Sequence, residues 1–135
     1  MLLTREALVT AAESGGVPTE RIAVPELAAD GYVIVRGMTG WERDAWERSL
    51  VKGRGKRRDI DTENVRARLA VRCLVDDTGA RIFRDDEAGV LGKLRVDVLQ
   101  RIFEVAQKLS GVSDEDIDEL GSPSAPVAGS APPTK

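Results

Sequence analysis

The apolar residues between positions 98 and 110 recur with the spacing of one helix face, and this pattern constrains the fold more than any other feature of the chain. The residues concerned are Val98, Leu99, Ile102, Phe103, Ala106 and Leu109. Such an i, i+3, i+4, i+7 series predicts a long amphipathic helix whose apolar face must be buried against other elements. Asp97 and Gln100 suit the start of this helix, and Lys108 followed by Gly111 suits its end.

Two segments of opposite character follow this helix. Ser113 and Asp116 have the spacing of a capping box, so residues 113–120 are expected to form a short acidic helix. Residues 121–135 contain four of the six prolines and no large apolar side chain. We expect this tail to be disordered, because it cannot bury enough surface to offset the entropy lost on ordering.

The N-terminal part of the chain predicts a short helix and then a β-hairpin. The helix is expected over residues 4–12, with a threonine as its cap. Residues 20–27 and 32–36 have the composition of two strands, and an Asp-Gly pair between them suits a tight turn. Pro25 has no amide hydrogen to donate, so its strand should lie at the edge of a sheet.

A second helix is expected from about residue 39 to residue 52. Thr39 and Glu42 form a capping-box pattern at its start. Four apolar residues are predicted to share one side of it: Trp41, Ala45, Trp46 and Leu50. We favour core anchoring for this stripe and keep a partner-facing patch as the alternative, because large aromatic side chains dominate both kinds of contact.

A further helix over residues 64–75 completes the predicted fold. Its Val65, Leu69 and Cys73 repeat every four residues and are expected to face inward. The predicted fold class is therefore α+β and mostly α. An N-terminal β-hairpin packs against three main helices, followed by the short acidic helix. We expect one α-rich domain over residues 20–120, preceded by the segment 1–19 and followed by the tail.

Composition excludes several classes of function. The 135 residues suit one domain, since domains usually run to about 100–150 residues. The chain has no histidine, a net charge of −3 and a single cysteine, so catalytic triads, most zinc sites and an internal disulfide are excluded. We expect no enzyme activity, no cofactor and no metal. Neither a signal peptide nor a membrane span is recognisable, so we expect a soluble intracellular protein with no membrane partner.

Residues 52–58 place five positive charges in a glycine-containing loop. We favour a solvated loop, because no aromatic residue is interleaved for stacking on bases. Two alternatives remain open. The loop could bind nucleic acid, or Lys56, Arg57 and Arg58 could meet an acidic protein surface, in which case charge reversal should weaken capture in a salt-sensitive way.

From Glu20 to Leu120 the chain resembles the small tail assembly chaperones of long-tailed, siphovirus-like bacteriophages and prophages. The likeness lies in the order of five segments: VPEL (24–27), VRGMTGWERD (35–44), NVRARL (64–69), LVDDTGARIF (74–83) and LQRIFEVAQKLSGVSDEDI (99–117). The last segment is the most specific, because it combines a helix, a glycine break and an acidic restart.

This resemblance implies a binding protein without catalytic residues. Such chaperones act in the host cell cytoplasm, bind the tape measure protein, help to recruit tail tube protein and leave the finished virion. Many also have a longer form made by ribosomal frameshifting. The candidate contact residues are Trp41, Trp46, Leu50, Ile102, Phe103 and Val105. The alternatives are a small nucleic-acid-binding or regulatory protein acting through residues 52–58, and a structural tail or connector component.

Overall fold

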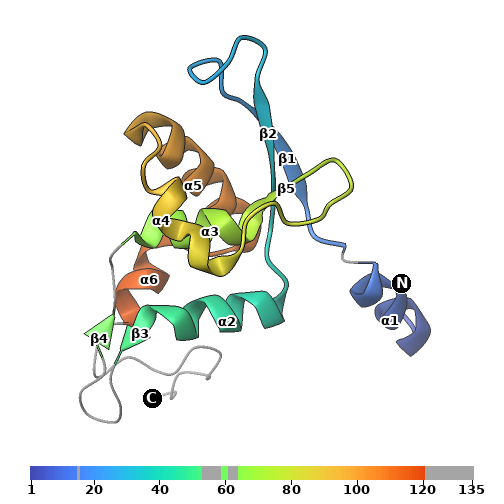
Figure 1. Cartoon of the computed structure of the whole chain (residues 1–135). Helices are drawn as coiled ribbons and strands as arrows, with labels where there is room; N and C mark the ends of the chain where they lie inside the picture. Colours follow the sequence, from blue (N-terminus) through green and yellow to red (C-terminus); the bar gives the residue numbers. More distant parts are fainter. Residues whose placement is uncertain (15, 53–58, 61–63, 121–135) are drawn as a thin grey trace.

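The computed structural model describes residues 1–14, 16–52, 59–60 and 64–120. Its helices are α1 (Arg5–Glu13), α2 (Gly40–Leu50), α3 (Val65–Cys73), the 3₁₀ helix η2 (Asp85–Glu87), α4 (Ala88–Leu91), α5 (Val96–Ser110) and α6 (Asp114–Leu120). Its strands are β1 (Thr19–Ala23), β2 (Tyr32–Arg36), β3 (Val51–Lys52), β4 (Asp59–Ile60) and β5 (Leu74–Val75). Figure 1 shows this mostly helical arrangement with a small sheet at one side of the main helices, which confirms the predicted α+β class.

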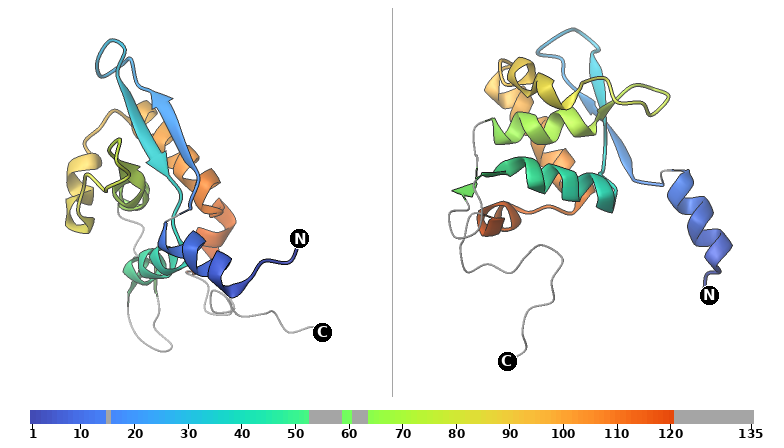
Figure 2. Two further views of the ribbon diagram at one scale, coloured as in Figure 1. Left: turned by 90° about the vertical axis from the view of Figure 1, so that its right-hand side faces the viewer. Right: turned by 60° about the horizontal axis from the view of Figure 1, so that its bottom comes forward.

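The N-terminal hairpin belongs to a three-stranded antiparallel sheet with the order β1-β2-β5, in which β2 is the central strand and β1 lies at an edge. Ile22 pairs with Val33, and Val35 pairs with Leu74 of β5. Ile22, Val35 and Leu74 are all buried. Helices α3, α4 and α5 gather on one side of the sheet in Figures 1 and 2, so the hairpin packs against helices as predicted.

Both strands of the hairpin were predicted, but their connection is longer than expected. β1 ends at Ala23, so Pro25 lies beyond the strand and not within it. The missing amide hydrogen of proline accounts for this early end, because it removes a donor from the ladder. Asp30 adopts the left-handed conformation with φ 60°, and the Gly31 amide donates to Ala28 O at 2.8 Å.

The core lies where α3 and α5 pack on each other and on the sheet. From α5, Val98, Ile102 and Ala106 are at most 1% exposed. From α3, Leu69 and Cys73 are fully buried, as their four-residue spacing predicted. These elements pack together because burying each large aliphatic side chain contributes about 1.5–3 kcal/mol of transfer free energy.

Side chains fix the starts of three helices as the sequence predicted. Thr4 Oγ1 accepts from the Ala7 amide at 3.1 Å at the start of α1. At α2, Thr39 Oγ1 accepts from the Glu42 amide at 3.2 Å, and Glu42 Oε1 accepts from the Thr39 amide at 2.8 Å. At α6, Ser113 and Asp116 make the same reciprocal pair at 3.1 and 2.9 Å. These capping boxes satisfy amides that the helices leave without partners.

Three helix boundaries differ from the prediction. α5 begins at Val96, its N-cap Arg95 makes no capping hydrogen bond, and Asp97 lies in the first turn. α3 ends at Cys73, because Leu74–Val75 leaves the helix to pair with β2. In the same way, α2 ends at Leu50, and Val51–Lys52 pairs with Asp59–Ile60. The end of α5 at Gly111, with φ 70°, is as predicted.

Helix α1 is the element that stands apart. None of its residues is buried, and it projects from the start of β1 away from the other helices (Figures 1 and 2). The predicted disordered tail and most of the predicted basic loop lie outside the described residues. No helix in the described part of the chain is long and apolar enough to cross a membrane.

Candidate partner-binding surface

The two tryptophans of α2 have opposite environments. Trp46 is 1% exposed, whereas Trp41 is 83% exposed. The prediction that both share one apolar side is wrong, because residues five positions apart lie on different sides of a helix with 3.6 residues per turn. Trp46 anchors the core together with Leu50, which is fully buried. Trp41 is the tryptophan that a partner can reach.

The candidate contacts on α5 also belong to the core. Ile102 is 1% exposed and Phe103 is 5% exposed, while Val105 is half-buried against the core. Trp46 and Leu50 are buried, as the favoured interpretation of core anchoring predicted, and the burial of Ile102 and Phe103 argues against partner contact through these two residues. The cationic candidates Lys56, Arg57 and Arg58 lie outside the described residues, so their role stays a prediction.

The charged residues around the core are held by one another. Arg43 on α2 contacts Glu47 at 3.1 Å and Asp116 of α6 at 3.6 Å, so it joins two helices. Arg36 pairs with Glu42 beside the start of α2. Burial tends to raise the pKa of the Glu42 carboxyl, but hydrogen bonds from Thr39 and Arg36 lower it overall. These groups position helices and are not arranged around a cleft.

The hairpin loop is tied to α5 by a second charged pair. Both Arg101 guanidinium nitrogens donate to Glu26, at 3.0 and 2.5 Å, and one of them also donates to Ala23 O at 3.1 Å. The hydrogen bonds from Arg101 lower the pKa of Glu26 to about 2. The loop between β1 and β2 is therefore held against α5.

Two acidic residues after α3 make structural contacts. Asp76 Oδ1 accepts from the amides of Thr78 and Ala80 at 2.9 and 3.1 Å, and the Thr78 hydroxyl bond lowers the pKa of Asp76. Asp85 bridges Arg72 and Arg81 at 2.9 and 2.7 Å. Asp76 therefore stabilises a turn, and Asp85 links α3 to the segment before η2 through two arginines.

The single thiol is not placed for chemistry. Cys73 is fully buried, and burial raises its pKa to about 11. A thiol needs a lowered pKa and access to react near neutral pH. Among the described residues, no group of three His, Cys, Asp or Glu side chains could hold a metal ion.

One apolar surface was not singled out from the sequence. A groove of about 270 Å³ runs between the start of α3 and the start of α5. Its apolar lining is Val65, Ala67, Leu94, Val96 and Leu99. Val96 is 78% exposed. The helix was predicted to begin at residue 98, so the apolar periodicity did not assign Val96 to either face of it.

The comparisons with known proteins show a shared fold and do not show a family. No protein-family model matches the chain, and no curated protein matches it in sequence. Among solved structures, the tail assembly chaperone of bacteriophage HK97 is similar, with a TM-score of 0.54 and 19% identity. The match covers 82% of this chain and 100% of that one. At this identity the likeness establishes a shared fold.

Proposed function

We propose that this chain is a phage tail assembly chaperone that binds the tape measure protein and helps to recruit tail tube subunits. The observation that carries the proposal is the shared fold with the HK97 tail assembly chaperone over the whole of that protein. The order of sequence segments that resembles this family, from Glu20 to Leu120, also supports it. We place the chain in the host cell cytoplasm during tail assembly.

The surface chemistry suits such a client. A tape measure protein is long and largely helical, so it exposes apolar stripes until the tail forms around it. Such a stripe is recognised when its apolar face lies in a groove or against anchoring aromatic residues. Trp41 is the exposed aromatic side chain most suited to this role, since tryptophan is enriched among residues that dominate binding energy.

Co-expression with the tape measure protein tests the proposal. We expect the chain to move the tape measure protein from the insoluble to the soluble fraction and to co-purify with it. Trp41→Ala should reduce capture, whereas Tyr32→Ala is a matched control, because Tyr32 is a half-exposed aromatic residue on the sheet. Equal insolubility of the tape measure protein with and without the chain would contradict the proposal.

A structural tail or connector component is the alternative that remains in the particle. Mass spectrometry of purified virions distinguishes the two, because a chaperone should be absent and a structural component present in a fixed ratio to tube protein. The other alternative is a small nucleic-acid-binding or regulatory protein that acts through the basic segment 52–58. If this segment binds nucleic acid, replacing Lys56, Arg57 and Arg58 with glutamate would abolish a complex whose affinity falls steeply with salt.

A further inference from the structure

The groove between α3 and α5 combines an apolar floor with an exposed apolar edge. Leu99 at 8% exposure forms its floor, Val65 and Leu94 are partly buried, and Val96 at 78% exposure stands at its edge. Its volume of about 270 Å³ is smaller than the roughly 300–1,000 Å³ of sites that enclose small molecules. It therefore suits one or two anchoring side chains of a larger partner.

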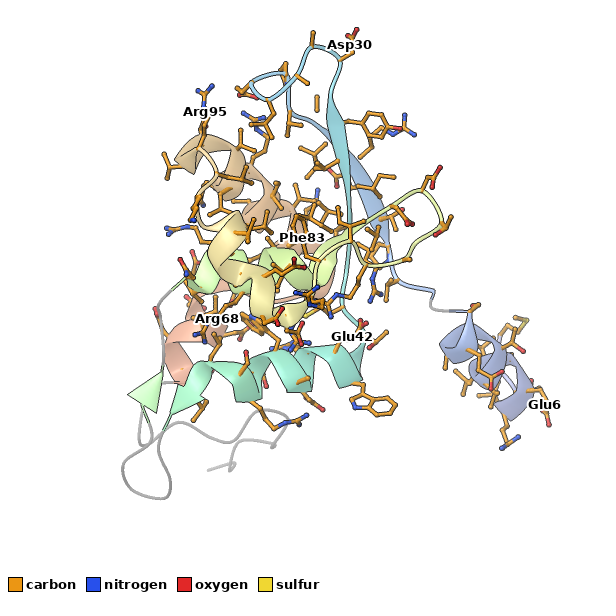
Figure 3. The ribbon with its side chains drawn as sticks, in the orientation of Figure 1. Glu6, Asp30, Glu42, Arg68, Phe83 and Arg95 are labelled. Carbon is orange, nitrogen blue, oxygen red and sulfur yellow. The ribbon has the colours of Figure 1, made fainter. Side chains whose placement is uncertain are left out.

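The charges around this groove are mainly positive although the chain as a whole carries −3. Lys93 and Arg95 flank Leu94 in sequence, and Arg66 lines the groove from α3. Figure 3 shows Arg95 at the start of α5, extending away from the packed helices. Asp97 opposes this charge in part, because it contacts Arg95 at 3.0 Å.

Neighbouring contacts hold the cationic side of the groove in place. The Arg66 guanidinium donates to Gln100 on α5 and lies 5.8 Å from the centroid of the Phe103 ring. Gln100 in turn donates to Glu104 at 2.9 Å. Arg66 is thus positioned across the junction of α3 and α5, on one side of the apolar floor.

From this arrangement we infer that the groove is a docking site for an amphipathic helix whose apolar side chains are flanked by Asp or Glu. The partner's apolar side chains would contact Leu94, Val96 and Leu99, while its carboxylates would face Lys93, Arg95 and Arg66. Complementary charge mainly sets encounter rate and orientation, and apolar contact supplies most of the affinity. This inference rests on the proposed function, because it names the chemistry of the client segment that this surface would take.

Two designed peptides test the docking chemistry without the natural client. Both are helical peptides of about 18 residues, long enough to form a helix in solution, with one leucine stripe. The stripe is flanked by glutamate in one peptide and by lysine in the other. Binding to the full chain is followed by fluorescence anisotropy at low and at high salt. A parallel arm replaces the peptide with anionic phospholipid vesicles.

Three variants of the full chain locate the binding. Val96→Glu changes an exposed residue of the groove lining, and the double variant Lys93→Glu, Arg95→Glu changes two exposed residues next to that lining in sequence. Both variants should leave the fold intact. Ile82→Glu is the matched control, since Ile82 is 50% exposed and does not line this groove. We expect the glutamate peptide to bind about tenfold more tightly than the lysine peptide, a difference of about 1.4 kcal/mol. The two groove variants should weaken binding by about tenfold and the control by less than about twofold.

Equal binding of the two peptides, an unchanged affinity in Val96→Glu, or binding of vesicles in place of the glutamate peptide would overturn the inference. The proposed function is judged separately by capture of the tape measure protein. If the unmodified chain captures that protein and the groove variants capture it equally well, the function stands and the docking site is rejected. If the glutamate peptide binds at the groove while the tape measure protein is not captured, the docking site stands and the client assignment is rejected.

Discussion

Helices α1 and α5 were both predicted from the sequence, yet their environments in the structure are opposite. α5 buries five of its residues, from Val98 to Ala106, whereas α1 buries none. α1 is also short, with nine residues, and isolated helices below about 12–15 residues are marginal in water. Apolar spacing thus identifies the face of a helix that can be buried, but it does not identify the molecule that buries it.

The same contrast occurs within one helix. Trp46 and Trp41 are five residues apart on α2, and their exposed fractions are 1% and 83%. Substitutions at paired positions of this kind test whether the buried member stabilises the fold and whether the exposed member serves another purpose.

The largest effect is expected for Trp46→Ala. Removing this fully buried indole should lower the free energy of unfolding by about 3–5 kcal/mol, because a cavity remains where the side chain packed. Trp41→Ala should change it by less than about 0.5 kcal/mol, as for other surface substitutions. Urea unfolding followed by circular dichroism measures both. Equal destabilisation by the two variants would remove the distinction between core and surface.

A smaller effect is expected at the helix caps. Thr39→Ala should cost about 1 kcal/mol, because the capping box at α2 is lost from a helix that packs on the core. Thr4→Ala removes the equivalent cap of α1. The second variant should not change the urea midpoint of the domain, since α1 buries no residue. A lower urea midpoint for Thr4→Ala would contradict this expectation, because it would mean that α1 is coupled to the core.

The buried thiol predicts a loss of stability at alkaline pH. Burial raises the pKa of Cys73 to about 11, above its ordinary value of 9.0. The folded state therefore holds this proton more tightly than the unfolded state, so the contribution is complete below pH 9 and is lost as the pH rises towards 11. Cys73→Ala should have a flatter stability profile over this window. Rapid modification of the native thiol by a thiol reagent at pH 8 would contradict its burial.

The smallest effect is expected at the tether between the hairpin loop and α5. Hydrogen bonds from Arg101 lower the pKa of Glu26 from 4.5 to about 2. The folded state thus favours the carboxylate, so the contribution is present above about pH 4.5 and is lost as the pH falls towards 2. Glu26→Gln should remove this part of the acid dependence. Hydrogen exchange of the loop amides at pH 5 and pH 3 measures it, and identical profiles for the two proteins would argue against the tether.

The parts of the fold that depend on local chemistry were predictable from sequence. The capping box of α2, the end of α5 at Gly111 and the inward side of α3 at Leu69 follow from residues within one or two turns. Strand β5 was not predictable, because its two residues form a strand only by pairing with β2. Long-range pairing therefore determines the structure of that segment. The separation of Trp41 from Trp46 is different, because it follows from helix periodicity and was open to prediction.

The candidate site was less predictable than the fold. Large apolar residues were predicted to make the partner contacts, but large apolar residues also build the core. Trp41 is the chosen apolar residue that is exposed. The groove beside Val96 arises where α3 and α5 meet, so no single stretch of sequence reveals it.

Sedimentation velocity of the purified chain mixed with the tape measure protein tests the central claim most directly. The proposed chaperone function predicts a faster-sedimenting species that contains both proteins, and the amount of this species should fall with Trp41→Ala but not with Tyr32→Ala. Two proteins that sediment independently at every ratio, while both remain folded, would contradict the claim that this chain is a chaperone of the tape measure protein.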